Sequence, residues 1–148
     1  MASEERLYDS LSINDLKKLR ELALEEHKSF FKRNPHLHKA FYNSLIGICL
    51  CQGAASHYLD PTVGIKDFDI WHFYLESKKS RFPYRAHKKI KNGYKGKSID
   101  FLKRVIPKRI YDLSPKSPEK IIMNYPVSYT HLRAHETEAD LVCRLLLE

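Results

Sequence analysis

The sequence predicts an α/β domain of the α+β class, in which a small mixed β-sheet is flanked by helices, one of them a long N-terminal helix. The helix is predicted over Asn14–Lys32, where apolar residues recur with a helical period. The strands are predicted over three apolar segments, Leu45–Cys51, Ile65–Tyr74 and Ser98–Leu102, of which the first two are the most apolar. We expect the three strands to be adjacent in one sheet and the helix to pack against it.

The long helix has signals at both ends. Ser12 and Asn14 are residue types that cap helix N-termini. Asn34-Pro35 ends the pattern, because the residue before a proline disfavours helical backbone. A short helical turn is predicted over residues 36–43, so residues 1–44 form an N-terminal helical segment. The apolar positions of the long helix are Leu16, Leu19, Ala23, Phe30 and Phe31.

Residues 45–126 form the predicted core domain. Its first strand, LIGICLC, is continuously apolar, as is typical of a buried strand, and it stops at Gln52-Gly53. A short helix is predicted over Ala54–Leu59, before the loop that leads into the second strand.

Residues 127–148 resemble translated sequencing-adapter DNA. The stretch VSYTHLRAHET (127–137) matches the translation of a transposase-type adapter, and LVCRLLLE (141–148) resembles a translated adapter end. We therefore expect a non-native tail that packs poorly on the rest, with leucines that favour a helix from local propensity alone. This interpretation implies that the core domain is truncated at its C-terminus. The alternative is a natural amphipathic C-terminal helix.

The chain without this tail is strongly basic. The tail holds two of the 26 Lys and Arg residues and four of the 18 Asp and Glu residues, so residues 1–126 carry 24 basic and 14 acidic residues, a formal net charge of +10. Between Lys78 and Arg109, thirteen cations accompany one acidic residue, Asp100. Such a run is commonly a solvated face, and it also suits binding to a triphosphate or to nucleic acid.

The chain shows neither an apolar signal region at its N-terminus nor a long apolar span, which argues against secretion and against a membrane partner. Cys49 and Cys51 are expected to be reduced thiols, since no signal peptide accompanies them. These observations predict a cytoplasmic protein.

The second strand carries two aspartates in an apolar, aromatic setting, KDFDIWHFY (66–74). Aspartate is depleted in strands, and residues i and i+2 of a strand share a face, so Asp67 and Asp69 are expected side by side. Two adjacent carboxylates repel each other unless a cation or a proton lies between them. The pair therefore indicates a metal site, with surface aspartates paired to Lys or Arg as the alternative.

The order of these features resembles the nucleotidyltransferase superfamily, the polymerase-beta-like fold. An apolar strand is followed by Gly53-Ala54 and a short helix, and twelve residues separate Ala54 from Asp67-Phe68-Asp69, which lies on a strand. The third carboxylate of that family lies on a later adjacent strand, where Asp100 is well placed. The resemblance covers Leu45 to about Ile106 and implies a mixed sheet of the nucleotidyltransferase type.

The resemblance implies metal-dependent transfer of a nucleoside monophosphate from an NTP to a hydroxyl acceptor. Asp67, Asp69 and Asp100 would be the catalytic residues and would ligate Mg²⁺ or Mn²⁺. The acceptor would be a small molecule, a protein side chain or an RNA end. The residues implied to bind the nucleotide phosphates are Gly53, Ala54 and Ser56.

One departure from the family pattern bears on activity. In that family, the second small residue after the first strand is often a serine whose hydroxyl contacts phosphate. Ala54 has no hydroxyl, so either Ser56 or the backbone alone would contact the phosphate. A catalytically inactive module that binds nucleic acid or a protein partner through its basic surface is therefore an alternative function.

The candidate ligands and the histidines also have structural alternatives. Asp100 could be a surface carboxylate that pairs with Lys103 or Arg104. His57 and His72 are expected to be packing or hydrogen-bonding residues rather than metal ligands.

Overall fold

The computed structural model describes residues 6–51, 57, 60, 62, 64–83 and 86–113, and the backbone of residues 143–147. The predicted phosphate-binding residues Gly53, Ala54 and Ser56 lie outside the described residues, as does the predicted 54–59 helix apart from His57. Of the loop that leads into the second predicted strand, residues 60, 62 and 64 are described.

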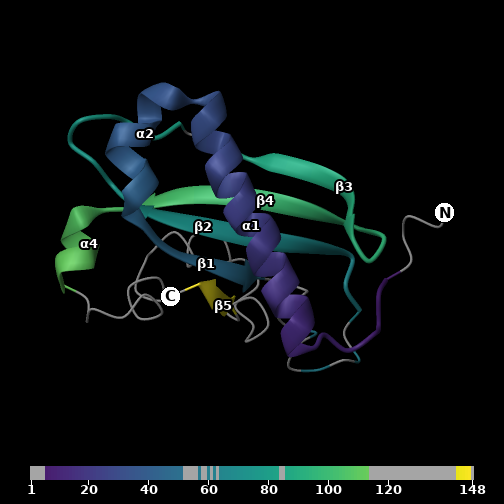
Figure 1. The fold of residues 1–148 in the computed structure, drawn as a ribbon. Helices are drawn as coiled ribbons and strands as arrows, with labels where there is room; N and C mark the ends of the chain where they lie inside the picture. Colours follow the sequence, from purple (N-terminus) through teal and green to yellow (C-terminus); the bar gives the residue numbers. More distant parts are fainter. Residues whose placement is uncertain are drawn as a thin grey trace.

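The described elements form one mixed sheet with helices against both faces (Figure 1). The strand order is β3-β4-β2-β1-β5, in which β2 and β4 are parallel and the other neighbours antiparallel. The predicted α+β class is confirmed, and the three predicted strands are adjacent, as β4, β2 and β1. In chain order the elements are α1 (Ile13–Arg33), α2 (Pro35–Phe41), the 3-10 turn η2 (Tyr42–Ser44), β1 (Leu45–Cys51), β2 (Asp67–Leu75), β3 (Lys88–Tyr94), β4 (Lys97–Ile106), α4 (Lys108–Leu113) and β5 (Cys143–Leu147).

Helix α1 begins with a capping box at Ser12. The Ser12 hydroxyl accepts a hydrogen bond from the Asp15 backbone N–H at 3.1 Å, and the Asp15 carboxylate accepts one from the Ser12 N–H at 2.8 Å. Asp15 also accepts a hydrogen bond from the Tyr94 hydroxyl at 2.5 Å and lies 3.4 Å from the Lys95 ammonium, which ties the helix start to the β3–β4 hairpin. Neither α1 nor any other described helix is long and apolar enough to cross a membrane.

Alternation of side chains along the strands gives the sheet two different faces. Phe68 and Ile70 of β2 pack in one cluster with Leu19 and Ala23 of α1. Burial of each large apolar side chain in such a cluster contributes about 1.5–3 kcal/mol. Trp71 belongs to a second cluster on the opposite face. The other members of this second cluster are Cys49, Phe73 and Ile106, with Ile110 and Tyr111 of α4 packed against them.

A buried ion pair lies between α1 and the sheet. The Lys103 ammonium donates to the Glu26 carboxylate at 2.7 Å and to the Ala86 carbonyl at 2.9 Å, and the side chain of Lys103 is fully buried. Arg33 also donates to Glu26, at 2.9 Å. Burial raises the pKa of Glu26, but the hydrogen bonds and charges of Arg33 and Lys103 outweigh it, so the pKa is below its ordinary value. One cation of the predicted solvated run, Lys103, is therefore a core residue.

Strand β3 lies inside the basic run and was not predicted. It forms one edge of the sheet, is largely exposed, and makes a hairpin with β4. Lys95 (φ 49°) and Gly96 (φ 74°) adopt the left-handed conformation at the turn, as the favoured two-residue hairpin turns require. The lysines of β3 suit an exposed edge, because charged side chains there oppose pairing with another chain.

Residues 143–147 pair antiparallel with β1 as strand β5. The expectation that the leucines of this segment favour a helix is therefore wrong for these residues, because strand pairing overrides local propensity. Cys51 is disulfide-bonded, whereas the buried Cys49 is a free thiol. The expectation of reduced thiols is thus correct for Cys49 and wrong for Cys51.

Candidate metal centre

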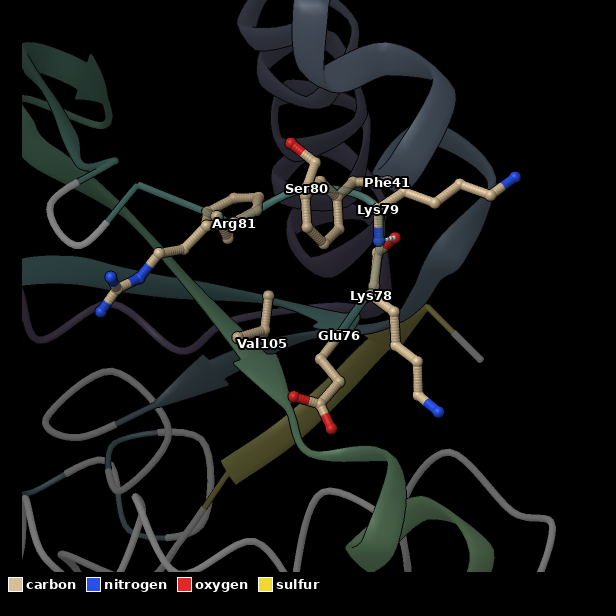
Figure 2. A pocket seen from close by; sticks show the side chains of 9 residues that line it. Phe41, Glu76, Lys78, Lys79, Ser80, Arg81 and Val105 are labelled. Atoms are coloured by element: carbon tan, nitrogen blue, oxygen red, sulfur yellow. Dashed lines mark hydrogen bonds between the residues drawn. The ribbon is translucent and has the colours of Figure 1, made fainter.

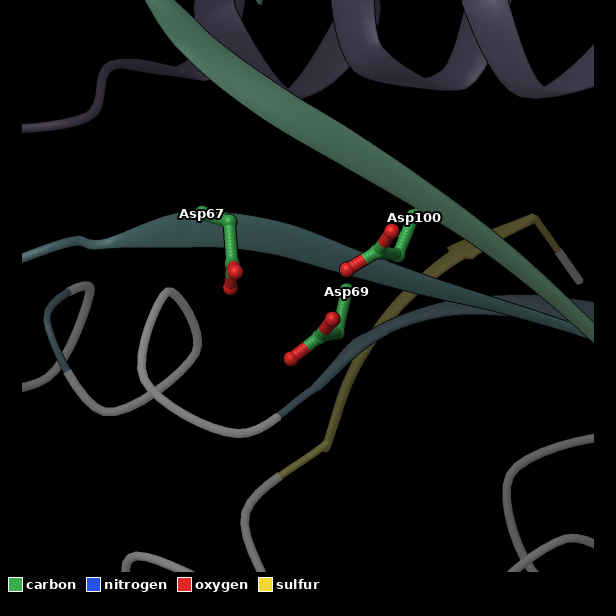
Figure 3. Close-up of side chains that lie close together, drawn as sticks. All are labelled: Asp67, Asp69 and Asp100. Carbon is green, nitrogen blue, oxygen red and sulfur yellow. The ribbon is translucent and has the colours of Figure 1, made fainter. Parts of the chain in front are cut away.

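Three carboxylates meet on the sheet face that α1 does not cover (Figure 3). Asp67 and Asp69 lie at the start of β2, and Asp100 lies on the parallel neighbour β4. Asp69 and Asp100 are register partners, and Asp67 shares a face with Asp69, so all three side chains project to the same side. The predicted convergence of the three aspartates, here termed the acidic triad, is confirmed.

The acidic triad has the spacing and the ligand type of a cation site. One carboxylate oxygen from each aspartate lies within 4.8 Å of the others, and each residue is partly buried. Oxygen ligands of one small divalent ion lie about 3–4 Å apart, given metal–oxygen distances of about 2.0–2.1 Å for Mg²⁺. The set contains only carboxylates, without His or Cys, which suits a hard cation rather than zinc. The acidic triad can hold a metal ion.

The electrostatics of the acidic triad agree with this geometry. Burial raises the pKa of Asp69, and the negative charges of Asp67 and Asp100 raise it further, to about 7. A hydrogen bond with Asp100 acts in the same direction, and the charge of Lys89 opposes it. The direction of this shift is the one expected for closely spaced carboxylates that repel each other. Near neutral pH, a proton and a metal cation therefore compete for the acidic triad.

No ion pair among the described residues includes Asp67, Asp69 or Asp100. The alternative in which Asp100 pairs with Lys103 is wrong, because Lys103 projects to the opposite face and binds Glu26. The guanidinium of Arg104 lies 5.7 Å over the ring of Trp71. Within the part of the chain that the structure describes, the acidic triad thus lacks the close cation that a simple surface pair would have.

The end of β1 lies beside the acidic triad. Cys51, the last residue of β1, is the register partner of Asp69. Gly53 follows Cys51 by two residues in the sequence. The last described residue of β1 therefore lies beside the acidic triad. The predicted phosphate-binding segment, which begins two residues later in the sequence, lies outside the described residues.

The histidines behave as the sequence predicts. A ring nitrogen of His72 lies 3.0 Å from the Ala23 carbonyl, inside the core, and one of His57 lies 2.6 Å from the Asp9 carbonyl. Burial lowers the pKa of His72 to about 4, so its ring is neutral in the folded protein near pH 7. Neither histidine belongs to the acidic triad.

Sequence reasoning missed one residue near this site, Lys89. It is the register partner of Asp100 on β3, so its side chain starts from the face that carries the acidic triad. The sequence placed it in a run of thirteen cations, and only recognition of β3 as a strand would have separated it from its neighbours.

A pocket of about 480 Å³ lies at the other end of the sheet (Figure 2). Phe41, Phe82 and Val105 contribute apolar lining, and the side chains of Lys78 and Lys79 extend outward from it. The pocket includes no residue of the acidic triad.

Comparisons with protein-family profiles, curated proteins and solved structures found no match for this chain.

Proposed function

We propose that the protein is a cytoplasmic, metal-dependent nucleotidyltransferase that moves a nucleoside monophosphate from an NTP to a hydroxyl acceptor. The observation that carries this proposal is the convergence of Asp67, Asp69 and Asp100 on one sheet face, within 4.8 Å and without an ion-pair partner among the described residues. A site built only to bind phosphate would be weakened by three carboxylates, whereas a metal–phosphate site needs them.

The carboxylate set fits Mg²⁺ or Mn²⁺, which prefer oxygen ligands and complete their coordination with substrate phosphates. When bound, two such ions activate the attacking hydroxyl and neutralise charge on the triphosphate and leaving group. Asp67 and Asp69 would hold both ions from one strand. Asp100, on the neighbouring strand, would hold the ion on the acceptor side and so orient the hydroxyl.

The phosphate side of the proposal rests on the sequence after β1. Gly53 lets backbone approach a phosphate closely, and Ser56 supplies the hydroxyl that Ala54 lacks. The acceptor is an alcohol of a small molecule, a protein or an RNA end.

A second candidate function is an inactive nucleotidyltransferase-like module that binds nucleic acid or a protein partner. The exposed edge strand β3 favours it, because the exposed Lys89 and Lys91 lie there. Phosphate contacts from such lysines make binding salt-dependent and insensitive to base sequence. This candidate does not require the acidic triad.

Pyrophosphate release separates the two candidates. The protein is incubated with each NTP, Mg²⁺ and a panel of hydroxyl acceptors, in parallel with the Asp67→Asn/Asp69→Asn variant. The proposal expects release that depends on metal and acceptor and is lost in the double variant. Equal release by parent and double variant would contradict it, and salt-sensitive RNA binding by both proteins without release would favour the inactive module.

A further inference from the structure

Residues 6–9, here termed the pre-helix segment, are attached to the chain that leads into β2. Leu7 and Ile65 form an antiparallel bridge, in which each backbone N–H donates to the carbonyl of the other residue at 2.8 Å. The Arg6 guanidinium donates to the Gly64 carbonyl at 3.3 Å. Leu7 also packs against the apolar cluster between α1 and the sheet. Residues near a chain end are commonly poorly ordered unless they are tied down, and these contacts tie the pre-helix segment down.

Two further contacts fix the pre-helix segment. The buried ring of His57 donates a hydrogen bond to the Asp9 carbonyl at 2.6 Å. Gly64 is buried, and a Cβ atom at this position would lie 2.6 Å from the Arg6 Cβ and 2.7 Å from the Tyr8 ring. Only glycine therefore allows the two stretches of chain to approach this closely.

The bridge lies two residues before the first carboxylate of the acidic triad. Asp67 is the first residue of β2 and pairs with β4. Within the described residues, the β1–β2 ladder ends at Cys51 and Asp69, so it does not reach Asp67. Asp69 and Asp100 each have a strand paired on both sides. In the described part of the chain, the backbone at Asp67 is held by β4 and by the bridge at Ile65.

We propose that the pre-helix segment positions Asp67 for the metal ion. The inference rests on the proposed function and extends it from the metal ligands to the groups that orient them. Groups that orient metal ligands affect the metal affinity strongly, although they do not touch the ion. Without the bridge, the start of β2 is held by β4 alone, and the Asp67 carboxylate is free to move away from those of Asp69 and Asp100.

Leu7→Pro and Leu7→Ala separate the bridge from apolar packing. Both changes remove the leucine side chain, but only proline removes the N–H that donates to the Ile65 carbonyl. Isothermal titration of the full chain with Mn²⁺ at pH 8 measures the metal affinity, and urea denaturation without divalent ions measures the free energy of unfolding. We expect Leu7→Pro to bind Mn²⁺ about 10-fold more weakly than Leu7→Ala, the lower end of the effect of groups that support metal ligands. Leu7→Ala is expected to lower the free energy of unfolding and to keep the Mn²⁺ affinity of the parent.

Gly64→Ala tests the same inference from the other side of the contact. The added Cβ displaces the pre-helix segment at Arg6 and Tyr8 and leaves Leu7 and the acidic triad unchanged in sequence. We expect weaker Mn²⁺ binding than in the parent, as for Leu7→Pro. This variant decides the question if Leu7→Pro does not fold.

The remaining outcomes separate the inference from the proposed function. A structural role alone would change the free energy of unfolding and leave the Mn²⁺ affinity of the folded protein unchanged. Equal Mn²⁺ affinity in Leu7→Pro and Leu7→Ala, or parental affinity in Gly64→Ala, therefore overturns the inference and leaves the proposed function standing. A parent chain that does not bind Mn²⁺ overturns the proposed function, and this inference with it.

Discussion

Asp69 on β2 and Asp100 on β4 are register partners in a parallel ladder, and both carboxylates lie on the face of the sheet opposite α1. Asp67, two residues before Asp69, completes the acidic triad. The arrangement is unfavourable without a bound cation, since Asp69 holds its proton to about pH 7. A protein that keeps such a cluster at the edge of a well-packed core sacrifices stability there, and this cost can be measured.

The first prediction concerns Asp69→Asn and pH. The pKa of Asp69 is about 7 in the folded protein against an ordinary value of 3.8, so its effect on stability is absent below pH 4. As pH rises from 4 to 7, the folded state holds a proton that the unfolded state has lost, and stability falls. Asn cannot ionise, so the variant escapes this loss. Between pH 5 and pH 8 we expect its advantage in unfolding free energy to grow by on the order of 2 kcal/mol, measured by urea denaturation without divalent ions.

Asp60→Asn is the matched control. The Asp60 carboxylate accepts hydrogen bonds from Thr62 at 2.7 and 3.1 Å, and these lower its pKa, so Asp60 is ionised throughout this pH range. Its effect on stability is expected to be the same at pH 5 and pH 8. A pH-independent effect of Asp69→Asn as well would show that Asp69 ionises normally.

The second prediction concerns divalent ions. At pH 8 we expect Mg²⁺ or Mn²⁺ to raise the unfolding temperature, because a ligand at 100 times its Kd stabilises the folded state by about 2.7 kcal/mol. At pH 5.5 the shift is expected to shrink, since Asp69 then keeps its proton. Differential scanning fluorimetry of parent and Asp67→Asn, with NaCl at equal ionic strength, checks this. An equal shift in both proteins would place the metal elsewhere.

The sequence predicted the main architecture because apolar patterning determines it. Strand β1 is continuously apolar, and the core face of α1 repeats with a helical period. Strand β3 escaped prediction because it is an exposed edge whose lysines resemble a loop or a solvated face. Strand β5 was expected as a helix, and its pairing with β1 is a tertiary contact that local propensity does not contain.

The sequence identified the three aspartates of the candidate site, but it predicted only part of their arrangement. Alternation along a strand brings Asp67 and Asp69 together from sequence alone. The position of Asp100 beside them depends on the parallel β2–β4 register, for which only the resemblance to a known fold gave a reason. The partner of Lys103 depends on where Glu26 of α1 lies across the sheet, so neither local pattern nor charge could identify it.

The third prediction concerns the buried Glu26–Lys103 pair. Glu26→Leu leaves the Lys103 ammonium with a hydrogen bond to the Ala86 carbonyl but no carboxylate, whereas Lys103→Met leaves Glu26 bound to Arg33. We therefore expect Glu26→Leu to lower the free energy of unfolding by about 3–5 kcal/mol, as for an uncompensated buried charge. Lys103→Met is expected to lower it by less. The double variant is expected to lose less than the sum of the single changes. Additive losses in urea denaturation would contradict a coupled pair.

The fourth prediction concerns the C-terminal segment. The interpretation of residues 127–148 as a translated adapter implies that the native fold does not depend on them. A chain of residues 1–126 is expected to keep its far-UV circular dichroism and a cooperative thermal transition. Loss of the transition would show that β5 supports the sheet and would contradict the interpretation of residues 127–148 as a non-native tail.

The most direct test of the central claim is a calorimetric titration of the full chain and of Asp67→Asn/Asp69→Asn at pH 8. Each protein is titrated with Mn²⁺, and then with each NTP in the presence and absence of Mn²⁺. The claim predicts that the parent binds Mn²⁺, that it binds an NTP more tightly with Mn²⁺ than without, and that the double variant loses both properties while it remains folded. Metal-independent NTP binding that is equal in the two proteins would contradict the assignment of the acidic triad as a metal–nucleotide centre.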